Sequence, residues 1–252
     1  MSVESINIPI INPKTFQDKI IFEDDDLLVV NKPGWLVCHP SKQGCWSSLV
    51  GATRAYLKQT SIHLVSRLDR ETSGLVVIAK NKATASLWQK GVMQKRVRRE
   101  YIALLSGRLA SCCRVELPIG KAVDSNVFVK QGVTSKIEGK PCITHFDPLE
   151  YRFGNTKCRV KTETGRMHQI RVHAQHLGHP IIGDKLYGID ENYYLKFIKT
   201  GWNPLWQETL KINRQALHAN KITRYSTVGE VEQVFSVGFA TDLNLFWENG
   251  FA

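Results

Sequence analysis

Short apolar runs separated by polar turns dominate the first third of the chain. Residues 20–22 and 27–30 are apolar runs divided by four acidic residues, which predicts a β-hairpin. The fully apolar run 75–79 predicts a buried strand, and residues 47–58 have apolar positions at helical spacing. The Asn-Lys-Pro-Gly sequence at residues 31–34 predicts a tight turn after the hairpin.

Further along the chain, the pattern predicts strands more often than helices. Helical spacing follows Asn81, with Ala83, Leu87 and Trp88 as the expected buried face, and it recurs over residues 166–177. An aromatic stretch, residues 193–206, is expected to lie in loops. Because strands outnumber helices and do not alternate strictly with them, the sequence predicts an α+β fold rather than a doubly wound parallel sheet. The further strands are predicted at residues 99–105, 115–119, 144–152, 158–163 and 231–237.

No repeat, low-complexity tract or linker composition divides the 252 residues of the chain. Residues 1–17 contain two prolines and little pattern, and they are expected to form an N-terminal arm on the surface. Residues 18–252 are expected to form one domain, which is within the size range of a single hydrophobic core.

The charge of the chain favours a polyanionic partner. Lys and Arg number 34 against 23 Asp and Glu, and residues 226–252 contain no Lys or Arg but four acids. The preceding residues therefore carry 34 basic against 19 acidic side chains. Phosphate contacts made by such a surface release counterions, which favours binding of nucleic acid. A basic protein that binds no nucleic acid is the alternative.

Several absences indicate the cellular location. No apolar run reaches the ~18 residues that span a bilayer, and the N-terminus lacks the pattern of a secretory signal. The six cysteines form no C-x-x-C pair and are expected to be reduced thiols. The sequence therefore predicts a cytoplasmic protein that does not enter a membrane.

A polar loop before the predicted buried strand holds a carboxylate among cations and hydroxyls. Asp69 is surrounded in sequence by Arg67, Arg70, Thr72 and Ser73. Flanking cations keep a carboxylate ionised, and a loop that enters a buried strand can hold a reactive group rigidly. The residues by themselves also fit a structural role, in which Asp69 caps the loop or forms a salt bridge.

A second polar segment, residues 164–173, contains Arg166 and Arg171 and leads into a group of histidines. His173 and His176 are spaced to share one helix face, as in a metal site. No carboxylate or thiolate stands at ligand spacing, however, and the nearby arginines would repel a cation. Polar packing and phosphate contacts are therefore the expected roles of these histidines.

A third segment places four cations before an aromatic residue: Lys95, Arg96, Arg98 and Arg99 precede Tyr101. Such a run is either a solvated charged surface or a track for RNA phosphates that leads to a base-stacking ring. The residues by themselves leave both interpretations open.

Together these segments resemble the RluA-type pseudouridine synthase family of RNA uridine isomerases. The family motif His-Arg-Leu-Asp, two variable residues and Thr-Ser-Gly-Leu is matched at residues 67–69 and 72–75, with Ser66 in place of the histidine. The motif Gly-Arg-x-His-Gln-Ile-Arg-x-His stands at residues 165–173, Gly-His-Pro-Ile-x-Gly-Asp follows at 178–184, and Tyr-Gly at 187–188. The order and length of these motifs make the resemblance specific, and it covers most of the chain.

The resemblance implies a single pseudouridine synthase catalytic domain with a mixed, mainly antiparallel central sheet, without the S4 domain that some members carry. It implies that Asp69 is the catalytic carboxylate, that Arg171 pairs with it and that Tyr101 packs on the target uracil. RNA contacts are expected from Arg67, Arg70, Lys95, Arg99, Arg166 and His168.

The implied reaction converts uridine to pseudouridine in ribosomal or transfer RNA. It is an isomerisation without redox change, so neither a cofactor nor a metal is expected. A monomer is expected, and no membrane partner. Residues 190–215, rich in Trp and Tyr, are a candidate for substrate contacts, and an aromatic subdomain that packs on the core is the alternative.

Two other functions are weighed against this one. A non-catalytic RNA-binding protein that retained the fold is favoured only by Ser66, because a hydroxyl cannot stack or carry charge as histidine does. A thiol hydrolase would use Cys38 beside His39. Adjacent side chains usually point apart, and no oxyanion motif follows, so the sequence gives this function little support.

Overall fold

The computed structural model describes residues 9–39, 44–225 and 232–250, and these fall into two compact units. The first unit is Met1–Arg98 with Ala219–Gly238, and the second is Arg99–His218 with Phe239–Ala252. Helices and antiparallel strand pairs occur in both units, which confirms the predicted α+β class.

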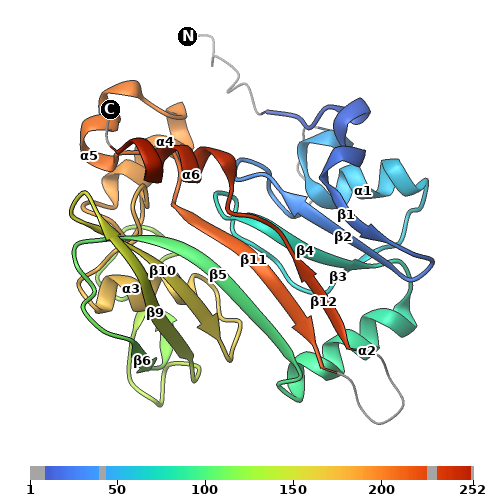
Figure 1. Cartoon of the computed structure of the whole chain (residues 1–252), viewed down its shortest axis with the longest axis horizontal. Coiled ribbons are helices and arrows are strands. Elements are labelled where there is room, and N and C mark those ends of the chain that lie inside the picture. The colour runs from blue at the N-terminus through green and yellow to red at the C-terminus, as the bar shows by residue number, and fades with distance from the viewer. Residues whose placement is uncertain (1–8, 40–43, 226–231, 251–252) are drawn as a thin grey trace. The chain divides into compact units, whose positions relative to one another are not determined.

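In the first unit, β2 (Leu27–Lys32) runs antiparallel to both β1 (Ile20–Glu23) and β4 (Ser73–Ala79), as Figure 1 shows. This confirms the predicted hairpin and the buried strand. The predicted turn at 31–34 begins later than expected, because β2 continues through Lys32. Two more strand pairs are antiparallel, β3 (His63–Leu64) with β4 and β11 (Leu217–Arg224) with β12 (Gln233–Ser236).

The strands β2 and β4 are buried on both faces. Leu28 and Val30 pack with Val76, Ile78 and the helix α1 (Leu49–Leu57). The alternate residues pack in a separate cluster with the helix α2 (Lys82–Met93): Leu27, Val29, Leu75, Val77 and Ala79. Because side chains alternate along a strand, two apolar clusters on opposite faces require an uninterrupted apolar run.

Side-chain caps begin the helices α1 and α2. The Ser48 hydroxyl accepts the amide of Gly51 at 3.1 Å, and the Asn81 Oδ1 accepts the amide of Thr84 at 2.9 Å. The buried face of α2 is Ala85, Trp88 and Gly91, so the prediction is confirmed for Trp88 and wrong for Ala83 and Leu87, which are exposed. The Trp88 ring sets this face, since it stacks on Phe235 of β12.

The predicted N-terminal arm is partly anchored. Residues 1–8 lie outside the described part of the chain, and two short 3-10 helices follow, Pro13–Thr15 and Gln17–Lys19. Phe16 is fully buried against the rings of Trp46 and Tyr56. The sequence pattern missed this contact because one isolated aromatic residue has no periodicity.

In the second unit, β10 (Asn155–Thr162) pairs antiparallel with β5 (Val97–Ser106) and with β9 (Ile143–Arg152), and β9 pairs with β6 (Cys113–Glu116). These strands confirm three of the predicted runs. The predicted strand 115–119 is divided, because β6 ends before Pro118, and Ile119 begins a separate pair, β7 (Ile119–Lys121) with β8 (Gln131–Val133).

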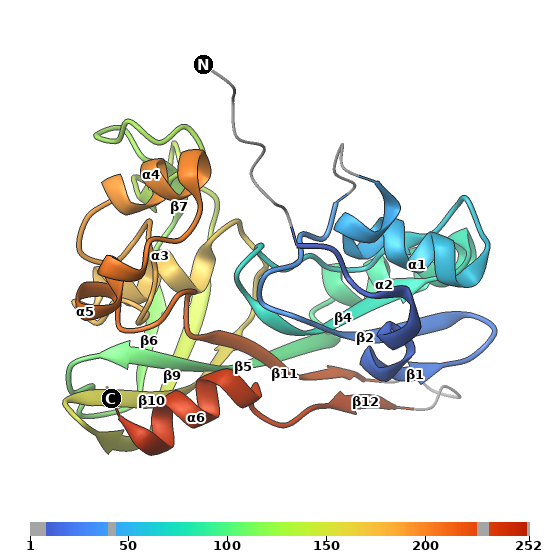
Figure 2. The same ribbon diagram turned by 90° about the horizontal axis from the view of Figure 1, so that it is seen from above.

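Two helices cover the core of the second unit. Ile170 and Ala174 of α3 (Gln169–His176) and Leu243 and Trp247 of α6 (Thr241–Asn249) join one apolar cluster with β5, β9 and β10. Figure 2 shows α3 and α6 on opposite sides of β5. The helix α3 starts three residues later than predicted, because His168 before it has a positive φ of 57°.

The aromatic stretch 193–206 differs from its prediction as loops. Its first half is α4 (Asn192–Thr200), followed by the 3-10 helix Pro204–Trp206 and α5 (Gln207–Leu210). Within residues 9–39, 44–225 and 232–250, no helix has the length and apolar composition needed to cross a bilayer.

Candidate active site

The loop that carries Asp69 lies between β3 and β4 in the first unit. Asp69 is partly exposed, whereas Thr72 and Ser73 after it are buried. The backbone carbonyl of Asp69 accepts the amide of Thr72 at 3.2 Å, which closes a turn. Asp69 therefore stands at the partly exposed start of a segment that is fixed by the core.

A buried lysine also fixes this loop by hydrogen bonds to backbone carbonyls. Lys32 has no exposed surface, and its ammonium donates to the carbonyls of Pro33 at 2.9 Å, Leu36 at 2.7 Å and Arg70 at 3.1 Å. A buried charge needs such partners because its loss of hydration is costly. The sequence pattern predicted only a turn at Lys32, although the position of this residue at the end of an apolar strand was a signal of burial.

Gly74 allows β4 to approach β11 closely. Its φ is +111°, and a Cβ at this position would lie 2.2 Å from the carbonyl oxygen of Ala219. Only glycine fits both the backbone angle and the space. The motif glycine, the second residue of β4, therefore fixes the start of this strand close to Asp69.

Cys38 and His39 lie beside the Asp69 loop but are not arranged as a nucleophile and base. Burial raises the pKa of the Cys38 thiol, although Lys32 acts in the opposite direction, and the thiol contacts the carbonyl of Leu68 at 3.3 Å. His39 Nε2 instead accepts a hydrogen bond from Arg67 at 2.6 Å. A protonated thiol is a weak nucleophile, so this geometry disfavours the thiol hydrolase.

In the second unit, Arg171 forms a buried bidentate pair with Asp184. Arg171 Nε donates to Oδ2 at 2.6 Å, and Nη2 donates to Oδ1 at 2.9 Å. The side chains are 8% and 0% exposed. Burial acts to raise the pKa of Asp184, but the charge and hydrogen bonds of Arg171 and the amides of Tyr187 and Leu186 outweigh it and hold that pKa below its ordinary value.

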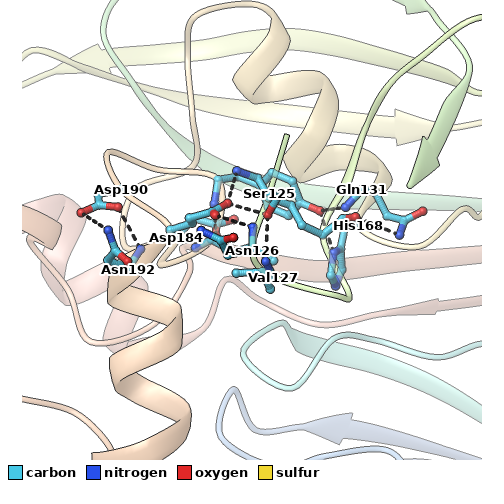
Figure 3. Close-up of polar contacts among 12 residues, drawn as sticks. Ser125, Asn126, Val127, Gln131, His168, Asp184, Asp190 and Asn192 are labelled. Atoms are coloured by element: carbon cyan, nitrogen blue, oxygen red, sulfur yellow. Dashed lines mark hydrogen bonds and ion pairs between the residues drawn. The ribbon is translucent and has the colours of Figure 1, made fainter. Parts of the chain in front are cut away.

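The Tyr187 hydroxyl links this pair to the motif that contains His168. It lies 2.8 Å from His168 Nδ1 and accepts the amide of Gln131 at 2.8 Å (Figure 3). The guanidinium of Arg171 stands over the Tyr187 ring, 4.8 Å from its centroid. Asp184 and Tyr187 stand at motif positions of the sequence, but the motif by itself indicates no role for either residue.

Gln169 fixes the turn that leads into α3. Its Oε1 accepts the Arg166 amide at 3.0 Å and the Thr164 hydroxyl at 2.8 Å, while its Nε2 donates to the carbonyl of Ile143 at 2.9 Å. Arg166 remains exposed, and its Nε donates to the carbonyl of Pro141 at 3.3 Å. The turn thus presents a cation on a rigid backbone.

Arg99 and Tyr101 stand two residues apart on β5, so their side chains share one face of the strand. The guanidinium of Arg99 lies against Gly165, where a Cβ would come within 3.0 Å of Nη1. Tyr101 is half-buried and packs on the apolar cluster of the second unit. The structure therefore brings the third segment next to the second.

His173 is a packing residue. It is fully buried, with Nδ1 2.8 Å from the Thr144 hydroxyl and Nε2 3.1 Å from the carbonyl of Leu117. Burial holds its pKa below the ordinary value. His176, on the next turn, is exposed. Across residues 9–39, 44–225 and 232–250, no three His, Cys, Asp or Glu side chains are grouped as metal ligands.

The aromatic residues of 190–215 pack on one another and on a buried lysine. Lys185 Nζ lies 4.4 Å from the centroid of Phe197 and 5.3 Å from that of Trp202. Trp206 meets the rings of Tyr193 and Trp202 edge to face. These contacts favour the packing role over substrate contact for this segment.

The predicted site residues divide between the two units. The first holds Arg67, Asp69, Arg70 and Lys95, and the last of these is exposed in a turn with a φ of 56°. The second holds Arg99, Tyr101, Arg166, His168 and Arg171. The predicted pairing of Asp69 with Arg171 stays a prediction.

Comparison with known proteins connects these residues to one enzyme family. The family model described as RNA pseudouridylate synthase matches residues 26–176. The chain is 32% identical over 232 residues to the ribosomal large subunit pseudouridine synthase D of Salmonella typhimurium, which covers 89% of this chain and 68% of that protein. The protein of the same name from Yersinia pestis is 30% identical over 236 residues, 92% of this chain and 70% of its own length.

Solved structures show the same likeness. The structure named human RNA pseudouridylate synthase domain containing 1 is 26% identical and matches with a TM-score of 0.68 over 89% of this chain and 85% of its own. Human RNA pseudouridylate synthase domain containing 4, at 21% identity and a TM-score of 0.69, covers 92% of both chains and shows the same fold.

Proposed function

The chain belongs to the RNA pseudouridine synthase family, and we propose that it isomerises uridine in ribosomal RNA with Asp69 as the catalytic carboxylate. The relatives named above act, by their names, on the large ribosomal subunit, which supports ribosomal over transfer RNA as the substrate. The observation that carries the catalytic assignment is the fixed loop that places Asp69 among Arg67, Arg70 and the buried Thr72.

The reaction requires a carboxylate that stays ionised and in place. The N1–C1′ bond of uridine breaks, the uracil turns, and a C5–C1′ bond forms while C5 loses its proton and N1 gains one. A carboxylate can attack or stabilise the electron-poor sugar carbon, as in retaining glycosidases. The three carbonyl contacts of Lys32 and the turn closed by Thr72 support this role, because they hold the loop rigid before the substrate binds.

The remaining site residues are proposed to serve the same nucleotide. Tyr101 packs on the target uracil, and Arg171 supplies the positive charge that keeps the catalytic carboxylate ionised. Its bidentate contact with Asp184 supports this role, because it orients the guanidinium. Extruding a base costs a few kcal/mol, and cationic contacts to the RNA offset that cost. The cationic contacts come from Arg67, Arg70, Lys95, Arg99 and Arg166, and His168 adds a polar contact.

Release of tritium from RNA labelled at uridine C5 tests the proposal, because the C5 proton leaves only when pseudouridine forms. The wild-type chain is expected to release tritium from ribosomal RNA, and Asp69→Asn is expected to release none above background. Asp25→Asn is the control, because it removes the same charge from an exposed turn of the first unit. Full activity of Asp69→Asn would remove Asp69 from the mechanism.

The same assay separates the enzyme from a non-catalytic RNA-binding protein. RNA binding by the wild-type chain without tritium release from any ribosomal or transfer RNA would favour the binding protein, the function for which Ser66 is the only support. Location in the cytoplasm and a monomeric state stay predictions.

A further inference from the structure

A hairpin in the second unit extends from the core next to the His168 motif. It consists of residues 119–133, with β7 and β8 as its two strands, and we call it the 119–133 hairpin. Ile119 and Val127 are buried in a cluster with Val172 of α3, Leu186 and Tyr187. The base of the hairpin is therefore part of the folded unit.

Polar contacts fix the tip of the hairpin as well. The Glu191 carboxylate accepts hydrogen bonds from the Ser125 hydroxyl at 2.7 Å, the Asn126 amide at 3.1 Å and the Lys130 ammonium at 2.8 Å. Figure 3 shows Ser125 and Asn126 in this network, and the Gln131 amide donates instead to the Tyr187 hydroxyl at 2.8 Å. The backbone on both sides of residue 128 is thus held in place by side chains outside the hairpin.

Phe128 projects from this fixed backbone into solvent. Its relative exposure is 80%, and the ammonium of Lys121 lies 4.6 Å from its ring centroid. A phenyl ring held in water has no structural benefit to the hairpin, because the apolar contacts of the hairpin are made by Ile119 and Val127 on the buried side. A rigid ring with a cation on it is suited to stack on a base while the cation binds a phosphate.

The charge around the ring favours nucleic acid over an apolar protein partner. Residues 119–141 contain three exposed lysines, Lys121, Lys136 and Lys140. Arg166 adds a fourth cation, since its guanidinium donates a hydrogen bond to the carbonyl of Pro141 at the end of this segment. Of the two acids there, Glu138 accepts hydrogen bonds from the hydroxyls of its own turn. The same Tyr187 hydroxyl contacts Gln131 of the hairpin and His168, one of the residues expected to bind RNA.

We propose that Phe128 and Lys121 form a stacking platform for an unpaired base of the substrate RNA, separate from the nucleotide that reacts. The inference rests on the proposed function only in taking RNA as the ligand. The platform adds affinity and selects RNA with an unpaired segment beside the target, because base stacking is available only to unpaired bases.

Binding of a fluorescein-labelled single-stranded RNA, followed by anisotropy in an Asp69→Asn background, tests the platform without turnover. Phe128→Ala is expected to weaken binding roughly 5- to 150-fold, the range for loss of one stacked base, and Phe128→Tyr to restore it. Phe153→Ala is the matched control, because Phe153 is also exposed, at 54%, with the Arg152 guanidinium 5.6 Å from its centroid. It is expected to bind as the parent does.

Two further measurements distinguish stacking from simple charge attraction. Lys121→Gln is expected to reduce the slope of log K against log salt by about 0.7, while Phe128→Ala leaves that slope unchanged. An abasic strand of the same length is expected to bind the parent and Phe128→Ala equally. In tritium release by otherwise wild-type enzyme, the loss caused by Phe128→Ala is expected in KM rather than kcat.

The platform is overturned if Phe128→Ala binds the RNA as tightly as the parent, or if it loses the same affinity for the abasic strand. Neither result would contradict the proposed isomerisation, because that proposal is tested separately by tritium release. Conversely, absence of tritium release together with weakened binding by Phe128→Ala would remove the proposed enzyme activity and support the platform.

Discussion

Replacing Asp184 by Asn tests how strongly the second unit depends on its buried ion pair. Asp184 Oδ1 accepts Arg171 Nη2 and the amides of Leu186 and Tyr187, and Oδ2 accepts Arg171 Nε. In the variant, Oδ1 keeps its partners, but an amide NH2 group replaces Oδ2. This group is a donor and cannot accept the hydrogen bond from Arg171 Nε. Arg171, whose side chain is 8% exposed, loses its counter-charge.

The expected cost is large because water cannot replace the carboxylate. Removing one partner of a buried pair costs about 3–5 kcal/mol. At about 2–4 °C per kcal/mol for a chain of this size, the melting temperature is expected to fall by roughly 6–20 °C. The pKa of Asp184 is depressed in the folded protein. Its stabilisation is therefore present above the unfolded pKa of about 3.9 and is lost as the pH falls through the folded value.

Thermal unfolding followed by circular dichroism measures the difference, and the same chain offers a control of matched geometry. Arg214 pairs with Asp242 through the same atoms at 2.6 Å and 2.9 Å, but the Asp242 side chain is 54% exposed against 0% for Asp184. Asp242→Asn removes the same charge and is expected to cost about 1 kcal/mol or less. Equal costs for the two variants, or a cost for Asp184→Asn that persists unchanged to pH 3, would refute the reasoning.

Two further outcomes are expected from residues outside this pair. Gly74→Ala is expected to destabilise the protein by at least about 3 kcal/mol, because the new Cβ would meet the Ala219 carbonyl. Gly178→Ala, with a φ of +76° and no atom within 4 Å, is expected to cost about 1 kcal/mol, and similar melting temperatures for both would contradict the steric argument. For His173, whose folded pKa is lowered by burial, the unfolding free energy is expected to fall as the pH drops below about 6.5, because the unfolded state then takes up a proton that the folded state does not. An NMR titration of the ring with a midpoint at or above that value would contradict this.

The local pattern of the sequence predicted much of the first unit. The continuous apolar run of β4 indicated burial, and the structure buries it between two helices. Asn81 was placed immediately before a helix, and its side chain caps that helix. These predictions succeed because strand periodicity and capping depend on residues that are neighbours in the chain.

The family was also determined by the sequence, since several long motifs occur in one order. What those motifs do was decided only by the tertiary structure. Lys32 reads as part of a turn, but the folded chain surrounds its ammonium with the carbonyls of Pro33, Leu36 and Arg70. Likewise, Asp184 reads as the end of a motif, and its partner Arg171 stands thirteen residues earlier.

The buried face of α2 and the helix α4 were decided by contacts across the fold. Trp88 stacks on Phe235, which belongs to a strand distant in the sequence, and this contact determines which face of α2 is buried. The rings of 193–206 lie on a helix and turns because they pack around the buried ammonium of Lys185. The spacing of apolar residues along the chain predicts only which side chains are buried. Which partner each buried side chain meets depends on chain segments that come together only on folding, so that information is available only in the structure.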